Sequence, residues 1–270
     1  MQNITKCGLG LRREHLSDII KSGFKPDFWE VTPENWFFIP HAHRANFEQI
    51  AHDNLLVAHS VTLSIGSDIK PSKKYLKNLK AFLDRYDIKF YSDHISFSTL
   101  NAHHTHELLP LPLTHEMLNL LCERVEYVQN ELKREIILEN ATYYYTLECE
   151  MSETEFTNLL MNKSGAKLLL DVNNVYVNSV NHKFDPYKFI DELDLSRLGY
   201  IHVAGHMDDR DYKMLVDTHG GDVCDEVWQL LAYTLKKQKA PCMIERDNEI
   251  PPLAELITEY EKMREIWKSA

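Results

Sequence analysis

The chain has 270 residues, close to the roughly 250 residues typical of one (β/α)8 barrel. Its content of 44% hydrophobic and 26% charged residues is typical of globular proteins and excludes disordered and fibrous classes. Lys and Arg number 30 against 41 Asp and Glu, a formal net charge of −11, so we do not expect nucleic acid as a partner.

The sequence does not favour a membrane segment or a disulfide framework. No apolar stretch approaches the roughly 18 residues that a membrane span needs, and the N-terminal segment lacks the apolar core of a secretory signal. We therefore expect a cytoplasmic protein without a membrane partner. The five cysteines are odd in number and include no CxxC pair, which predicts reduced thiols.

Short apolar runs alternate with amphipathic stretches along the whole chain, which predicts βα units around a parallel sheet. The predicted strands, in chain order, are 7–11, 28–31, 55–59, 89–94, 136–139, 168–171, 198–202 and 241–245. Apolar residues recur at three- and four-residue spacing in 74–86, 115–132 and 223–237, which predicts helices there. Thr114 and Ser152 stand where helix N-caps are expected.

About eight strands in 270 residues favour a closed TIM barrel over an open doubly wound sheet, whose sequence pattern is almost the same. No linker or low-complexity segment divides the chain. We therefore expect an α/β protein in which residues 1–270 form one metal-binding barrel domain.

Polar residues follow the apolar part of six predicted strands. They are His59, Asp93 and His94, Glu139 and Asn140, Asp171 and Asn174, His202 and His206, and Glu245 and Asp247; Asp217 and His219 lie in the long connection after the seventh strand. The carboxyl ends of parallel barrel strands open on one face, so these side chains are expected to converge there. Several carboxylates in one mouth repel each other unless a cation lies among them. Imidazole, carboxylate and amide ligands without thiolate suit iron, manganese or zinc.

Other motifs are less specific. The imidazole-rich segment 101–106 is more often a solvated active-site loop than a metal site. Glu34 and Asn35 either hold substrate or cap the following segment. Neither a GxGxxG motif nor a P-loop is present, so no nucleotide cofactor is expected.

Several further segments carry recognisable motifs: 59–67 (HSVTLSIGS), 92–96 (SDHIS), 108–112 (LLPLP), 138–140 (LEN), 171–178 (DVNNVYVN), 201–206 (IHVAGH), 217–220 (DTHG), 244–247 (IERD) and 250–253 (IPPL). Taken together, these segments resemble the multinuclear non-haem iron-dependent oxidative enzymes, a family that includes the iron oxidase of methanobactin biosynthesis. The segments cover nearly the whole chain. The chain is also similar, more distantly, to metal-dependent AP endonucleases and sugar isomerases, which implies a xylose isomerase-like barrel.

The resemblance implies two or three iron ions in mixed Fe(II) and Fe(III) states, with Zn or Mn as alternatives. By this analogy, His59, His94 and Glu139 hold one ion, and Glu139 bridges to a second ion held also by Asp171, His202 and Glu245. Asn174, Asp217 and His219 would hold a third. The resemblance implies that the nucleases have a His ligand at the position of Asn174. A neutral amide binds metal more weakly than an imidazole does.

The implied reaction is the O2-dependent oxidation of a cysteine in a ribosomally made precursor peptide. The cysteine thiolate would bind a ferric ion while a neighbouring ferrous ion activates dioxygen, and hydrogen would leave the carbon next to sulfur. Asp93, Asn140, His206 and Asp247 are then the candidates that orient ligands or transfer protons. Family members commonly work beside a small partner protein that presents the peptide.

Two other functions remain open on the residues alone. One is a metal-dependent hydrolase or sugar isomerase with zinc or manganese, which would need no oxygen. The other is a non-catalytic, metal-dependent peptide-binding module.

Overall fold

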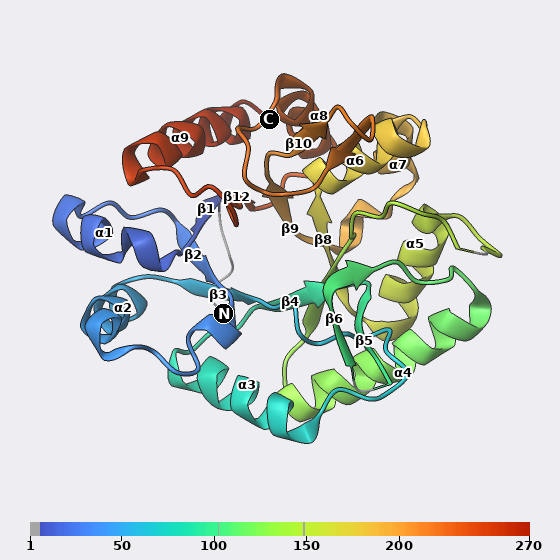
Figure 1. Cartoon of the computed structure of the whole chain (residues 1–270), viewed down its shortest axis with the longest axis horizontal. Coiled ribbons are helices and arrows are strands. Elements are labelled where there is room, and N and C mark those ends of the chain that lie inside the picture. Colours follow the sequence, from blue (N-terminus) through green and yellow to red (C-terminus); the bar gives the residue numbers. More distant parts are fainter. Residues whose placement is uncertain (1–5, 102, 148) are drawn as a thin grey trace.

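Eight parallel strands close into a barrel in the computed structural model, which describes residues 6–101, 103–147 and 149–270 (Figure 1). The strands are β1 (Cys7–Gly10), β2 (Phe28–Val31), β3 (Leu56–His59), β4 (Tyr91–His94), β7 (Ile136–Glu139), β8 (Lys167–Asp171), β9 (Leu198–Val203) and β12 (Cys242–Ile244). Their bounds differ from the predicted ones by at most two residues. Since β12 pairs with β1, the sheet is closed, and the expected TIM barrel is confirmed.

Helices surround the barrel (Figure 1). They are α1 (Leu16–Ser22), α2 (His41–Asp53), α3 (Lys73–Arg85), α4 (His115–Leu132), α5 (Glu153–Ser164), α6 (Val172–His182), α7 (Pro186–Glu192), α8 (Asp225–Lys237) and α9 (Leu253–Ser269). Both predicted N-caps are confirmed: Thr114 Oγ1 accepts from Met117 N at 3.2 Å, and Ser152 Oγ accepts from Glu155 N at 3.1 Å. Among the described residues, none of these helices combines the length and apolarity needed to cross a membrane.

One layer of apolar side chains fills the barrel interior. This apolar layer consists of Phe28, Val57, Ile137, Leu169, Tyr200 and Met243, one from each of six strands. Strand β1 contributes Gly8, where an added Cβ would come within 2.3 Å of the Phe28 ring, so only glycine leaves that ring its space. Because side chains alternate along a strand, the residue two positions later on each strand points into the barrel too.

Two antiparallel hairpins lie outside the barrel sheet, and neither was predicted. They are β5 (Phe97–Leu100) with β6 (His103–Leu109), and β10 (Met207–Asp209) with β11 (Met214–Val216). The imidazole-rich segment expected as a loop is therefore mostly strand β6, although His104 and His106 are exposed as expected. Both faces of this strand carry polar residues, so the apolar alternation that marks a half-buried strand is absent.

Candidate metal centre

A layer of polar side chains lies directly above the apolar layer, at the carboxyl end of the barrel. This polar layer consists of Glu30, His59, Glu139, Asp171, His202 and Glu245, each two residues after a member of the apolar layer. All six are buried, and His94 joins them from the end of β4. Convergence at the strand ends thus follows from strand register and alternation, as the sequence predicts for the five of them that it singled out.

Glu139 lies between two groups of potential metal ligands. Its Oε2 atom is 3.2 Å from His59 Nε2 and 3.2 Å from His94 Nε2. Its Oε1 atom is 3.4 Å from His202 Nδ1 on the opposite side. The Ser92 hydroxyl engages His59 Nδ1 at 2.9 Å, which leaves His59 Nε2 directed at Glu139. The first two groups expected from the resemblance are therefore brought together, with Glu139 shared between them.

The second group contains Glu139, Asp171, His202 and Glu245, whose potential ligand atoms all lie within 4.8 Å of one another. His202 Nδ1 is 2.8 Å from Glu245 Oε2. Several buried atoms of this region make no hydrogen bond of good geometry with the described residues: both Glu139 carboxylate oxygens, Asp171 Oδ2, His202 Nδ1 and His219 Nε2. Carboxylate oxygens lie within 2.8 Å of the two imidazole nitrogens, but not in the direction of a hydrogen bond. Buried polar atoms are normally paired, so a group of such atoms that face one another suits a bound cation.

A third group surrounds His219. Its Nε2 atom is 2.7 Å from Asp217 Oδ1, and its Nδ1 atom is 3.2 Å from Glu245 Oε2 and 3.5 Å from Asp247 Oδ2. His219, Glu245 and Asp247 could hold one ion between them. Asp247, expected to orient ligands or transfer protons, therefore lies among the potential ligands themselves.

Asn174 has a different role in the geometry. Its Nδ2 atom donates to the Asn140 carbonyl at 3.0 Å, and its Oδ1 atom accepts from Thr142 Oγ1 at 2.8 Å. Thr142 also contacts Asp217 Oδ2 at 3.1 Å. The amide of Asn174 is thus held by hydrogen bonds beside the third group, and only one lone pair of its oxygen is left for an ion.

Three of the proposed orienting residues lie at different depths. Asp93 accepts from Leu63 N at 2.9 Å and stands 3.7 Å from His94 Nδ1, while Asn140 makes two hydrogen bonds to the backbone of Asp171. His206 is farther out. It contacts Asn173 at 2.8 Å, and Asn173 in turn donates to Asp217 at 2.9 Å, so the Asn173 side chain links His206 to the third group.

Glu30 is the buried carboxylate that sequence analysis missed. Its Oε2 atom accepts from the Tyr200 hydroxyl at 2.6 Å and contacts His202 Nε2 at 3.0 Å. The Tyr200 hydroxyl contacts Ser92 Oγ at 2.6 Å, and Ser92 contacts His59. One hydrogen-bond network therefore orients two of the imidazoles. The sequence does contain a signal for Glu30. It lies two residues after Phe28, just as every other member of the polar layer lies two residues after a member of the apolar layer.

Burial and neighbouring charge shift the pKa values of this centre strongly. Burial raises the pKa of Asp171 to about 8, against the opposing effect of His219. Burial lowers the pKa of His94, but Glu139 and Asp93 outweigh it and raise that pKa to about 9. In the chain alone, protons therefore supply the positive charge that these carboxylates need. A bound metal ion can supply it instead, and its binding releases protons.

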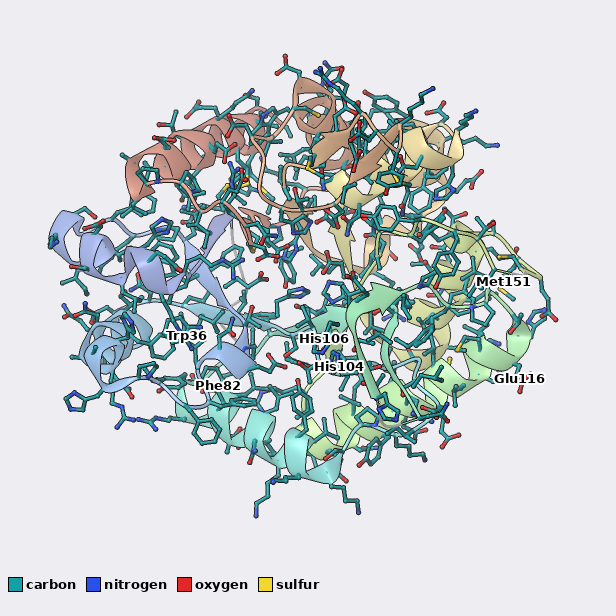
Figure 2. The ribbon with its side chains drawn as sticks, viewed as in Figure 1. Trp36, Phe82, His104, His106, Glu116 and Met151 are labelled. Atoms are coloured by element: carbon teal, nitrogen blue, oxygen red, sulfur yellow. The ribbon has the colours of Figure 1, made fainter. Side chains whose placement is uncertain are left out.

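A cavity of about 480 Å³ opens above the polar layer. It is lined by His59, His94, Asn174, Asp217, His219, Glu245 and Asp247, with Tyr144 and the exposed His104 and His106 at its rim. Figure 2 shows His104 and His106 over the centre of the barrel. Neither Glu34 nor Asn35 lines this cavity; the Tyr75 hydroxyl donates to Glu34 at 2.5 Å, and Asn35 is exposed. The cavity can admit a side chain or short segment of a larger substrate.

Comparison with known proteins gives one family and one fold. Residues 6–268 match the family described as "RiPP precursor modification enzyme MbnB/TglH/ChrH", where RiPP denotes ribosomally synthesised and post-translationally modified peptides. The UPF0276 protein of Shewanella loihica is 39% identical over 265 residues, covering 97% of this chain and 95% of that protein.

Two solved structures share the barrel. Endonuclease IV from Thermus thermophilus aligns with a TM-score of 0.59 at 14% identity, over 98% of this chain and 99% of that one. A xylose isomerase-like TIM barrel protein from Mycobacterium smegmatis, solved with magnesium, aligns with a TM-score of 0.58 at 13% identity, over 95% and 88%. The xylose isomerase-like fold expected from the sequence is confirmed.

Proposed function

The chain belongs to the RiPP precursor modification enzymes of the MbnB/TglH/ChrH family, and on that premise we propose that it is an iron- and oxygen-dependent oxidoreductase that acts on a cysteine of a precursor peptide. The observation that carries the proposal is the set of unpaired oxygen and nitrogen atoms around Glu139. This donor set contains imidazole and carboxylate without thiolate, which suits iron. We place the reaction in the cytoplasm, where such a peptide is synthesised.

We assign the proposed ligands by group. His59, His94 and Glu139 would hold one ion, Glu139, Asp171, His202 and Glu245 a second, and Asn174, Asp217 and His219 a third, with Glu245 and Asp247 in contact with His219. When bound, iron would supply redox chemistry with dioxygen and a site for the substrate thiolate. Two ions are expected to bind more tightly than the third, because Asn174 offers only a neutral amide.

The protein's own residues would position the ions and manage protons. Glu30 and Ser92 fix the orientation of His202 and His59. Asp247 is partly exposed at the rim and pairs with Arg12, so its Oδ2 atom is placed to receive the proton of an entering thiol and pass it to solvent. The apolar layer below excludes water from the base of the centre.

The test is mass spectrometry of a cysteine-containing peptide encoded beside the gene, incubated with the iron-loaded protein. We expect an oxygen-dependent mass change at the cysteine and none when that cysteine is replaced by serine, whose hydroxyl has a much higher pKa than a thiol. A small partner protein encoded nearby is added in a parallel reaction. Equal conversion by the zinc-loaded protein without oxygen would overturn the proposal in favour of a hydrolase or isomerase. Peptide binding without turnover, when iron, reductant and oxygen are all supplied, would favour a binding module.

A further inference from the structure

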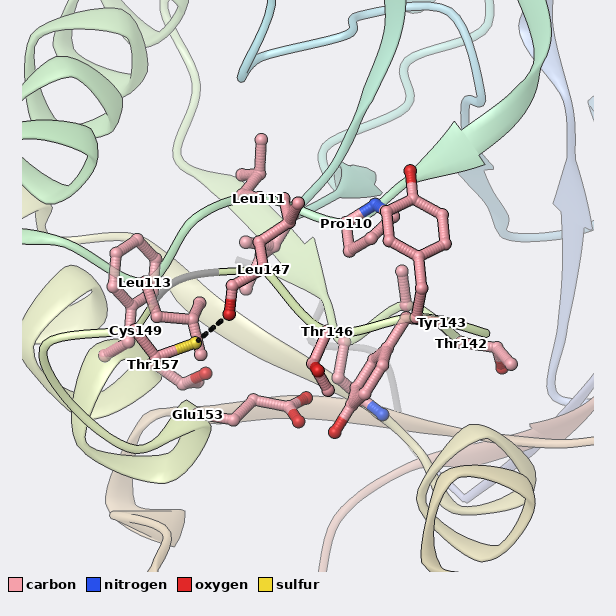
Figure 3. A pocket seen from close by; sticks show the side chains of 15 residues that line it. Pro110, Leu111, Leu113, Thr142, Tyr143, Thr146, Leu147, Cys149, Glu153 and Thr157 are labelled. Atoms are coloured by element: carbon pink, nitrogen blue, oxygen red, sulfur yellow. Dashed lines mark hydrogen bonds between the residues drawn. The ribbon is translucent and has the colours of Figure 1, made fainter. Parts of the chain in front are cut away.

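A second cavity, of about 90 Å³, lies beside the cavity above the metal centre. Figure 3 shows residues of its lining, which include Pro110, Leu111, Leu113, Leu147 and Cys149. Leu113 and Cys149 lie side by side, because they form a β-bridge. Ile95 and Phe156 complete an apolar surface. We call this cavity the side pocket. Its lining is more apolar than that of the cavity above the polar layer.

The side pocket shares a wall with the metal centre. Ala141 and Thr142 line both cavities, and they follow Glu139 closely in the chain. Thr142 is buried, and its hydroxyl contacts Asn174 at 2.8 Å and Asp217 at 3.1 Å. The wall is thus held by the proposed third group of ligands. An extended peptide with one residue in the cavity above the metal centre can place a nearby side chain in the side pocket.

We propose that the side pocket binds an aliphatic side chain of the peptide substrate, close in sequence to the residue that enters the metal centre. The proposal rests on the proposed function, since it takes the substrate to be a peptide. Size supports an aliphatic occupant, because the volume is smaller than the roughly 150 Å³ of an apolar cavity that accommodates benzene. Desolvation of the apolar walls and of the side chain favours binding.

Among the described residues, one carboxylate lines the pocket, and it does not require a cationic occupant. Glu153 lies in the first turn of α5, where the positive end of the helix dipole favours a carboxylate. The Tyr143 hydroxyl also lowers the pKa of Glu153, against the effect of burial. Burial raises the pKa of Glu153 to about 7, so part of its charge is lost at neutral pH. A lysine-type side chain reaching for Glu153 is the alternative that the experiment has to separate.

The experiment is methyl NMR on the full chain, without added iron and without oxygen. The probes are N-acetyl-norleucine N-methylamide and N-acetyl-lysine N-methylamide, which share an aliphatic stem and differ in the terminal ammonium. The reporters are the methyl groups of Ile95, Leu111, Leu113 and Leu147. We expect saturable shifts with the norleucine probe and about tenfold weaker binding of the lysine probe, because its ammonium loses hydration.

Thr146→Trp is the blocking variant, because Thr146 is exposed and lines the pocket. Thr258→Trp, at an exposed position of α9, is the matched control. Thr146→Trp should abolish the shifts, while Thr258→Trp should leave them unchanged.

Lysine binding as tight as norleucine binding would overturn the proposal, as would no saturable shift or unchanged binding in Thr146→Trp. Methyl signals remote from the pocket report whether each variant is folded. The measurement needs neither iron nor turnover, so its failure is distinct from a failure of the oxidation assay.

Discussion

The apolar layer and the polar layer lie on the same strands, two residues apart, and both are buried. In the apolar layer, burial removes hydrocarbon from water and stabilises the fold. In the polar layer, burial desolvates carboxylates and imidazoles and leaves Glu139, Asp171 and His202 with unpaired atoms. Burial therefore stabilises the folded chain in the apolar layer and destabilises it in the polar layer. The lower one supports the fold without a ligand, and the upper one requires positive charge.

The largest expected effect is loss of metal from the polar layer. Glu139→Gln keeps the shape of the side chain but removes the charge shared by the first two groups. We expect it to lose most of the bound metal and to lower activity by about 100-fold or more. His219→Ala should lose only the ion of the third group. Elemental analysis after anaerobic purification measures both variants, and equal metal content in the two would show that the ligand assignment is wrong.

The apolar layer should respond in stability rather than in metal content. Ile137 lies directly below Glu139 on β7, so Ile137→Ala removes packing without touching a ligand. We expect the free energy of unfolding to fall by about 2–5 kcal/mol. Denaturant titration of the metal-free chain measures it, and elemental analysis of the folded variant should match the parent. A drop in metal content as large as that of Glu139→Gln would mean that the two layers are not separable.

Glu30 joins the layers, since it contacts His202 in one and Tyr200 in the other. Glu30→Gln should weaken metal affinity by about 10- to 100-fold, because His202 loses the carboxylate that orients it. Competition with a chelator measures the affinity. Glu34→Gln is the control, since Glu34 is a nearby carboxyl outside the polar layer. Were both variants to bind metal like the parent, Glu30 would have no positioning role.

The smallest expected effect concerns Glu153, a carboxyl that no proposed ion compensates. Its pKa in the folded chain is about 7, above the ordinary 4.5, so the folded chain binds this proton more tightly than the unfolded chain does. Stability must then fall as pH rises between these two values, by at most roughly 3 kcal/mol, and by less because Glu153 is partly exposed to water. Glu153→Gln should remove this part of the pH dependence. Unfolding of both proteins at pH 5 and pH 8 measures it, and identical pH profiles would contradict the shift.

The barrel and most of the polar layer were predictable because both depend on local patterns. Short apolar runs ending in His59, Glu139 or Asp171 place polar groups at strand ends, and parallel strands bring those ends together. Glu30 was missed because it stands inside its strand and not at the end. Only its two-residue spacing from Phe28 indicates that its side chain points into the barrel. The place of Asp247 among the potential ligands depends on loop conformation and on Arg12, which is remote in the sequence. Sequence periodicity carries no such information.

The side pocket and the hairpins were not predictable for a related reason. The pocket forms between the segment after β6 and the segment after β7, and neither has a repeating pattern. The polar strand β6 lacks the alternation that would have marked it. Long-range packing of irregular segments therefore accounts for most of what the sequence did not reveal.

The seam between β1 and β12 has a consequence for folding and metal loading. Cys7 on β1 is the register partner of Cys242 on β12, and Arg12 donates to the Arg246 carbonyl at 2.7 Å. These contacts join residues more than 230 positions apart. Until the ribosome has made β12 and the residue after it, the barrel has neither its closing strand nor Glu245. Contacts between residues so far apart in the sequence form late in folding. The proposed second ion can therefore have all four of its ligands only after Glu245 has been synthesised and β12 has closed the barrel.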